Sequence, residues 1–159
     1  LTAIHLLLKP PFPTFCSYIS LGRVMEPVIS NLKVRSYECD SYGHVNNATY
    51  VNYLEYGRME MLHKHGITLK KLRALGVMVL IREIHIVYHY SAEPGEELQI
   101  HTSVKSGRKV GGVFRQVIRR ISDDKLVVEA DVTWVCVNDN GRPCRIPPVV
   151  IEALGLENV

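Results

Sequence analysis

Apolar positions along the chain change their spacing, and the change separates a helical segment from a run of strands. From Asn47 to Gly66 the apolar side chains recur at i, i+4, i+7 and i+11, which places them on one face of a helix. This stripe consists of Tyr50, Leu54, Gly57 and Met61. Gly66 is typical of a helix end, and a short second helix over Leu69–Leu75 is predicted to follow it.

Gly57 lies in the middle of the predicted long helix. Glycine at such a position costs about 1 kcal/mol relative to alanine. We expect it where the helix backbone must approach another element closely. The position therefore predicts close packing of this helix against a sheet.

The second half of the chain alternates apolar and polar residues, which is typical of half-buried strands. Turn residues such as Pro94-Gly95 and Asn138-Asp139-Asn140-Gly141 separate the alternating runs. The predicted strands are Asn31–Cys39, Val77–Tyr90, Leu98–Lys105, Val113–Ile121 and Leu126–Cys136, with a turn over 106–112. One long helix beside successive hairpin-linked strands predicts an α+β domain with a mostly antiparallel sheet.

The chain has 159 residues, of which 47% are apolar, and this is enough for one compact domain with a core. We assign this domain to residues 30–159. Residues 1–29 begin with an apolar run that prolines then interrupt, and they lack the basic start and cleavage site of a signal peptide. We treat them as an N-terminal extension of unknown role.

Charge and cysteine spacing narrow the function classes. The formal charge of +3 does not suggest a nucleic-acid binder, although it suits an anionic ligand. No apolar stretch approaches membrane-spanning length, so no membrane partner is expected. The four cysteines show neither CxxC nor Cys/His zinc spacing. His85, His89 and His101 alternate on strands without ligand-like carboxylates. We therefore expect no metal, and free thiols in a reducing cytoplasm.

The segment before the long helix carries the candidate chemistry. Asp40, Gly43 and His44 directly precede Asn46 and Asn47, which are good helix N-cap residues. A helix start has free N–H groups and a partial positive charge, so it can hold an oxyanion. Asp40 can act as nucleophile or general base. This combination suits acyl transfer.

Asp40-x-x-Gly43 followed by Val45, Tyr50, Glu55 and Arg58 resembles the signature of hotdog-fold acyl-CoA thioesterases of the 4-hydroxybenzoyl-CoA thioesterase type. The variant His44-Val45-Asn46-Asn47-x-x-Tyr50 is similar to plant acyl-lipid and acyl-ACP thioesterases. The resemblance covers about Leu32 to Pro147. It implies a hotdog fold, with the sheet wrapped around the central helix. It also implies hydrolysis of an acyl-CoA or acyl-ACP without a cofactor, and a homodimer or homotetramer.

The resemblance implies a role for four catalytic candidates. Asp40 falls on the family's catalytic aspartate, and the backbone N–H of Asn47 on its oxyanion-binding position. His44 is expected to hydrogen-bond the thioester oxygen or to orient Asp40. The plant motif has an asparagine two positions before this histidine, where this chain has Tyr42. Glu55 is the second-choice carboxylate.

Each candidate also has a structural interpretation. Asp40 can cap a turn, His44 can be a loop histidine bonded to backbone, and Glu55 can lie on a solvated helix face, paired with Arg58. A non-catalytic acyl-CoA-binding domain is the alternative function, and a hotdog dehydratase is a weaker one.

Substrate binding is assigned to four further residues. Gly43 supplies chain flexibility near the substrate, and Tyr50 belongs to the same motif. Arg108 and Lys109 lie in a basic, glycine-rich stretch, Lys105–Gly112, that can contact the phosphates of CoA or a carrier protein. A solvated hairpin turn is the structural interpretation of this stretch.

Overall fold

The computed structural model of the protein describes residues 25–156, so most of the predicted extension lies outside the described residues. In chain order the elements are β1 (Val28–Lys33), the 3-10 helix η1 (Ser36–Glu38), α1 (Asn47–Lys64), α2 (Leu69–Ala74), β2 (Val77–Tyr88), β3 (Glu97–Arg108), β4 (Gly111–Arg120), β5 (Leu126–Asn138) and α3 (Pro148–Ala153).

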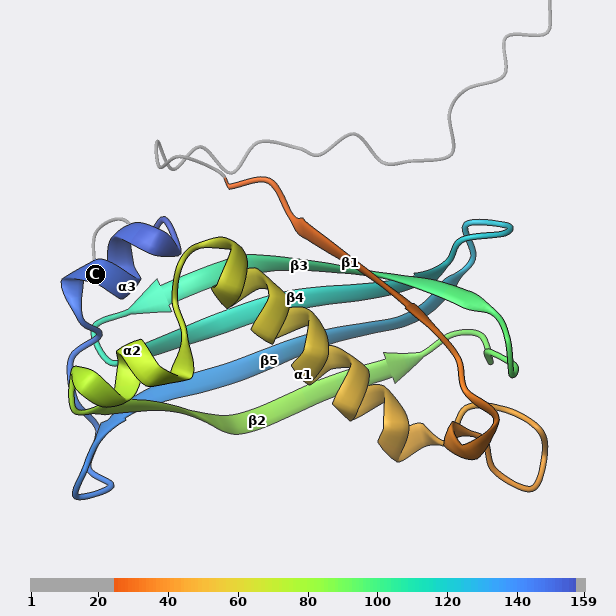
Figure 1. The fold of residues 1–159 in the computed structure, drawn as a ribbon, viewed down its shortest axis with the longest axis horizontal. Helices are drawn as coiled ribbons and strands as arrows, with labels where there is room; N and C mark the ends of the chain where they lie inside the picture. Colours follow the sequence, from red (N-terminus) through yellow and green to blue (C-terminus); the bar gives the residue numbers. More distant parts are fainter. Residues whose placement is uncertain (1–24, 157–159) are drawn as a thin grey trace, which may run out of the picture.

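The five strands form one antiparallel sheet in the order β1-β3-β4-β5-β2, so β1 and β2 are its edges. Figure 1 shows α1 lying lengthwise across one face of this sheet. The α+β arrangement with one long central helix is thus confirmed. No helix within residues 25–156 is both long enough and apolar enough to cross a membrane.

The core lies between α1 and the sheet face that it covers. The predicted helix stripe, Tyr50, Leu54, Gly57 and Met61, is buried in full. The facing strands contribute alternate residues, among them Ile100, Phe114, Ile118, Val132 and Trp134. The two periodicities read from the sequence therefore meet in one apolar layer.

A network of buried polar side chains interrupts this apolar layer beside Gly57. A Cβ atom at Gly57 would lie 2.7 Å from Ile100 Cγ2 and 2.9 Å from Thr102 Oγ1, which confirms the close approach. The Gln116 side-chain amide donates to the Leu54 carbonyl at 2.9 Å and to Thr102 Oγ1 at 3.0 Å. Its oxygen accepts from the Arg58 guanidinium at 2.9 Å. These hydrogen bonds satisfy the polar groups where the helix meets the sheet.

Arg58 differs from its sequence interpretation. It does not pair with Glu55 among the described residues, because its side chain is buried against Gln116 while Glu55 is exposed. Burial lowers the pKa of the Arg58 guanidinium.

The predicted strand Asn31–Cys39 was wrong at both ends. The strand runs from Val28 to Lys33, and the chain then leaves the sheet for η1. A capping box explains the exit, since the Arg35 backbone N–H donates to the Glu38 carboxylate at 2.7 Å. Alternation alone cannot show this local bond.

The sheet is also longer than predicted at the opposite end. The turn expected over 106–112 shortens to Lys109 and Val110, because β3 continues to Arg108 and β4 begins at Gly111. The helix α3 was not predicted at all.

We expect Gly57→Ala to destabilise the protein by about 1 kcal/mol in urea unfolding. Alanine gains about 1 kcal/mol of helix propensity, but overpacking costs about 1–3 kcal/mol. Overpacking should win because the neighbouring Thr102 and Gln116 atoms are held by hydrogen bonds. Asn52→Ala, at an exposed position of the same helix, is the control and should not destabilise. A stabilised Gly57→Ala variant would contradict the tight packing.

Candidate active site

A short loop carries Asp40 between η1 and α1. The Asp40 N–H donates to the His44 carbonyl at 2.8 Å, and the Gly43 N–H donates to the Asp40 carbonyl at 3.0 Å. Gly43 has φ of +79°, a conformation that favours glycine. A bridge between Cys39 and Val45 closes the loop. Gly43 therefore shapes the turn that presents Asp40.

The Asp40 carboxylate is exposed and only partly engaged. Its Oδ1 accepts from the Tyr42 N–H at 2.9 Å. Within the described residues, Oδ2 has no hydrogen-bond donor. The same side chain thus caps the turn, as its structural interpretation predicted, and keeps one oxygen available for chemistry.

The start of α1 offers a free donor. Asn46 is the N-cap, and its Oδ1 accepts from the Ala48 N–H at 2.9 Å. The Thr49 N–H donates to the Asn46 carbonyl at 2.9 Å. No described residue accepts a hydrogen bond from the Asn47 N–H. This N–H lies at the end of α1 where the helix dipole is positive.

One cavity of about 290 Å³ joins these groups. It is lined by Asp40, Val45, Asn47, Tyr50, Tyr88, His89, Tyr90 and Ser91. The Asp40 loop and the first turn of α1 therefore share this cavity with the last residue of β2 and the segment that follows it. Sequence reasoning did not select Tyr88, His89 or Tyr90 as site residues, because their alternation is that of an ordinary strand.

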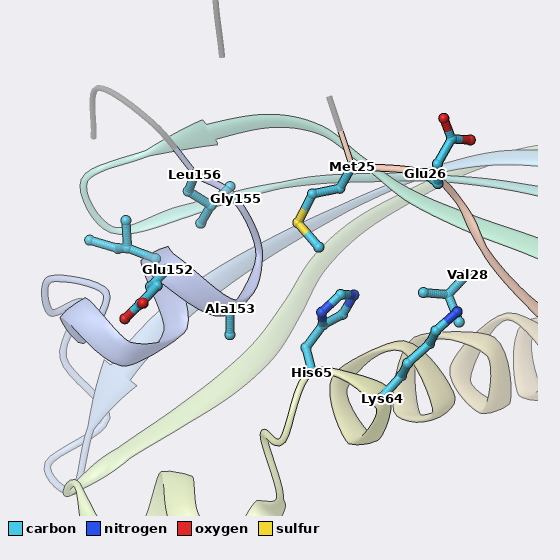
Figure 2. A pocket seen from close by; sticks show the side chains of 10 residues that line it. Met25, Glu26, Val28, Lys64, His65, Glu152, Ala153, Gly155 and Leu156 are labelled. Carbon is cyan, nitrogen blue, oxygen red and sulfur yellow. The ribbon is translucent and has the colours of Figure 1, made fainter. Parts of the chain in front are cut away.

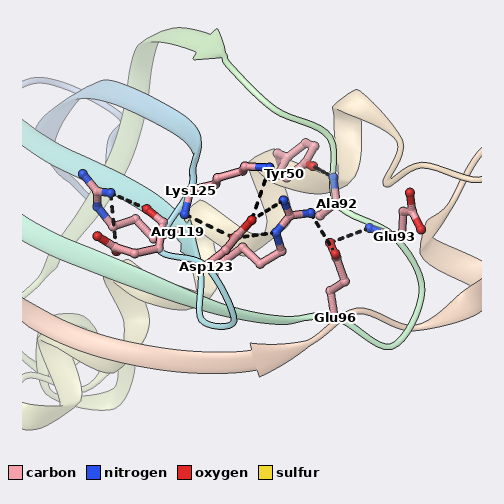
Figure 3. Close-up of polar contacts among 9 residues, drawn as sticks. Tyr50, Ala92, Glu93, Glu96, Arg119, Asp123 and Lys125 are labelled. Carbon is pink, nitrogen blue, oxygen red and sulfur yellow. Dashed lines mark hydrogen bonds and ion pairs between the residues drawn. The ribbon is translucent and has the colours of Figure 1, made fainter.

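Tyr50 forms the buried side of the cavity. Its hydroxyl accepts from the Ala92 N–H at 3.2 Å (Figure 3). Its ring lies 5.7 Å from that of Tyr88 and 5.8 Å from that of Tyr53. Burial raises the pKa of Tyr50 to about 12, so the phenol stays neutral.

The Glu38 side chain anchors the chain just before the Asp40 loop. Its carboxylate accepts from the Tyr53 hydroxyl at 2.8 Å and from the Arg35 guanidinium at 3.0 Å. Burial opposes ionisation, but the hydrogen bonds from the Arg35 backbone N–H, Tyr53 and the Arg35 side chain outweigh it and lower the pKa of Glu38. The tie from α1 to Glu38 fixes a point two residues before Asp40.

Three sets of ion pairs hold the β4–β5 turn beside the cavity (Figure 3). Arg120 contacts Glu96 and Asp123 at 2.8 Å each, and Arg119 lies 3.4 Å from Asp124. Lys125 lies 3.3 Å from Asp123 and 5.3 Å from the centre of the Tyr90 ring. The charges of this cluster are mutually paired, so it supports the cavity rim rather than forming a free anion site.

The other predicted site residues do not line this cavity. The His44 side chain is exposed, and its carbonyl closes the loop. Glu55 is exposed on α1. Arg108 and Lys109 lie at the tip of β3, where the Lys109 carbonyl accepts from the Ile146 N–H at 3.0 Å. Figure 1 shows this tip and the start of α1 at opposite ends of the sheet.

A second, larger cavity of about 760 Å³ lies at the far end of α1 (Figure 2). Its lining includes Met25, Lys64 and His65 together with residues of α3. It contains none of the predicted site residues. Within residues 25–156, no cluster of three or more His, Cys, Asp or Glu side chains is placed to hold a metal ion.

The five-stranded antiparallel sheet packed on α1 is a hotdog fold, and Asp40 and the start of α1 line one cavity in it. A sequence model of the thioesterase-like superfamily matches residues 34–154. The chain belongs to this superfamily, and the family resemblance drawn from the Asp40 motif is confirmed.

Named relatives support the same family. The chain is 32% identical to an acyl-acyl carrier protein thioesterase of Arabidopsis thaliana, ATL2, over 78% of this chain and 66% of that protein. It is 31% identical to the acyl-CoA thioester hydrolase YbgC of Escherichia coli, over 80% and 96% respectively. The solved structure of YbaW, a probable thioesterase from Escherichia coli, is 26% identical with a TM-score of 0.71, covering 80% and 96%. The chain thus spans about two thirds of the plant relative's length.

We expect Glu38→Gln to lower the free energy of unfolding at pH 7 by on the order of 1–2 kcal/mol, the value of charge-assisted hydrogen bonds. A carboxylate whose folded-state pKa is lowered stabilises the fold above its unfolded pKa, near 4.5, and loses this contribution as pH falls through the folded value. The gap between wild type and variant should therefore shrink on acidification.

Urea unfolding at pH 7 and at successively lower pH down to 3 measures this gap. Glu152→Gln, which removes a carboxylate exposed on α3, is the control. A gap that stays constant with pH would mean that the ionised Glu38 carboxylate does not stabilise the fold.

Proposed function

We propose that the protein is a thioesterase that hydrolyses an acyl-CoA or acyl-ACP to the free acid and the thiol. The observation that carries this proposal is the cavity lined by both Asp40 and Asn47, whose N–H has no acceptor among the described residues. A carboxylate and a free donor on opposite sides of a thioester carbonyl are what acyl transfer requires. Membership of the thioesterase-like superfamily supports it.

Asp40 acts through its available carboxylate oxygen. As general base it takes a proton from water, whose oxygen attacks the thioester carbonyl carbon. As nucleophile it attacks that carbon itself, and water then hydrolyses the resulting anhydride. In both routes the C–S bond breaks, and the thiolate leaves and takes up a proton. The products are one carboxylic acid and one thiol.

The Asn47 N–H stabilises the charge that develops during attack. The carbonyl oxygen becomes an oxyanion in the tetrahedral intermediate, and it accepts from this N–H at the positive end of α1. The Asn47 side chain has no part in this step. Tyr50 supplies a neutral, buried wall that keeps water from this side of the cavity.

The carrier of the acyl group is either CoA or a carrier protein. The relatives are named for both, since ATL2 is an acyl-acyl carrier protein thioesterase and YbgC is an acyl-CoA thioester hydrolase. A panel of acyl-CoA and acyl-ACP substrates with detection of the free thiol tests the proposal. Binding of acyl-CoA without release of thiol would favour the alternative, a non-catalytic binding domain.

Arg108 and Lys109 can serve the proposed substrate only across an assembly. They lie at the other end of the sheet from Asp40 within one subunit, so a second subunit would have to bring them to its neighbour's cavity. Glu55 is exposed on α1 and does not line the cavity, so it too would act in the cavity of a neighbouring subunit.

We expect Asp40→Asn to lower kcat about a hundredfold or more, the scale of a positioned acid/base group. The asparagine oxygen can still accept from the Tyr42 N–H, so the turn should keep its shape. His44→Ala should cost less, since its side chain lies outside the cavity lining, and Glu55→Gln should cost least. Steady-state kinetics on one good substrate ranks the three variants. If Glu55→Gln proves the most damaging, Glu55 carries the chemistry.

The edge strand β2 supports a homo-oligomer, with a homodimer as its simplest form and a homotetramer as an extension. Met78, Leu80 and Ile81 are 39%, 46% and 41% exposed. β2 pairs with β5 on one side only, so its other side presents unpaired backbone groups beside these apolar side chains. Pairing of two β2 edges would cover both.

We expect Leu80→Lys to convert the oligomer to monomer, because the charge would have to be buried in the β2 contact. Light scattering at micromolar concentration gives the mass. Val110→Lys changes a comparably exposed apolar residue in the β3–β4 turn and should leave the mass unchanged. A wild-type protein that is monomeric and active would contradict the assembly.

A further inference from the structure

The hydroxyl of Tyr88, the last residue of β2, reaches the first turn of α1. Its Oη donates to the Asn47 carbonyl at 3.1 Å. The ring packs against Tyr50 at 5.7 Å with an interplanar angle of 59°. Both Tyr88 and Asn47 line the cavity that contains Asp40. An edge strand of the sheet is thus bonded directly to the residue whose N–H is the free donor.

The peptide group between Asn47 and Ala48 is held at both of its polar atoms. Its carbonyl oxygen accepts from Tyr88, and its N–H donates to Asn46 Oδ1 at 2.9 Å. The preceding N–H, that of Asn47, has no acceptor among the described residues. The Asn47 N–H belongs to the adjoining peptide group, so the Tyr88 hydrogen bond ties the start of α1, and this free N–H with it, to β2.

We infer that Tyr88 is a positioning residue for the oxyanion donor, an inference that rests on the proposed thioesterase function. Asn46 belongs to the helix's own cap and moves with it. Tyr88 is anchored in the sheet, so it sets the helix start relative to the cavity wall. Because β2 is also the edge proposed for assembly, this hydrogen bond links the subunit contact to the geometry of the donor.

The expected loss of kcat in Tyr88→Phe can be compared with the loss caused by removing an oxyanion donor. Removing an oxyanion donor outright costs about 10²–10³ in kcat. Removing Tyr88 Oη leaves the Asn47 N–H in place but releases its orientation, so the loss should be smaller. We expect Tyr88→Phe to lower kcat about tenfold and to leave KM within about twofold, the pattern of an interaction realised in the transition state.

Tyr56→Phe is the matched control. Tyr56 is also on the α1–sheet boundary, and its hydroxyl donates to the Asn31 carbonyl of β1 at 3.5 Å. It therefore ties the same helix to the opposite edge of the sheet, away from the first turn and outside the cavity lining. Both variants keep the aromatic ring. Tyr56→Phe should leave kcat and KM unchanged.

A second readout does not need turnover. In ¹⁵N–¹H spectra of the full chain without substrate, Tyr88→Phe should shift the Asn47 and Ala48 amide signals, whereas Tyr56→Phe should not. This measurement separates the inference about Tyr88 from the proposed thioesterase function. If wild type hydrolyses no thioester, the proposed function fails, and the amide shifts still report whether Tyr88 orients the helix start.

Either of two results on kcat would overturn the inference, and a third concerns KM. One is an unchanged kcat in Tyr88→Phe together with unmoved Asn47 and Ala48 amides. The other is an equal loss of kcat in Tyr88→Phe and Tyr56→Phe, which would assign the effect to general tethering of α1. A loss confined to KM would also contradict it, because that pattern belongs to substrate contact.

Discussion

The close contact between α1 and the sheet at Gly57 is the constraint on which the rest of the molecule depends. Only a residue without a side chain lets the helix backbone come this close to the sheet. At this separation the Gln116 side chain donates a hydrogen bond to the Leu54 carbonyl and accepts one from the Arg58 guanidinium. The helix axis is thereby fixed over β3 and β4. Since the first turn of α1 carries the free Asn47 N–H, this contact also determines where the donor stands.

A series of aromatic contacts connects this part of the core to the Asp40 loop. Tyr50 packs against Tyr88 on one side and Tyr53 on the other, and Tyr53 bonds Glu38 just before Asp40. The carboxylate and the helix start are thus positioned by one connected set of side chains. No long-range electrostatic effect is needed to explain their meeting, because ordinary packing and hydrogen bonds suffice.

Much of this arrangement could be predicted from the sequence, for identifiable reasons. The helix and most strands follow from periodicity, since one buried face forces a regular spacing of apolar residues. Asp40, Asn47 and Tyr50 follow from the motif at the helix start. The bounds of β1 could not be predicted in this way, because the capping box of Arg35 and Glu38 competes locally with strand alternation. Tyr88 and the separation of Arg108 from the cavity depend on strand order, which periodicity does not encode.

The Asp40 loop also separates the groups that set its shape from the side chains that face solvent. Its shape is held by backbone hydrogen bonds and by Gly43, while the side chains of Tyr42 and His44 project into solvent. The shape of this segment therefore does not depend on the side chains that it exposes. A library that varies Tyr42 and His44 alone would sample new surfaces beside the Asp40 carboxylate, while the backbone hydrogen bonds and Gly43 keep the shape of the loop.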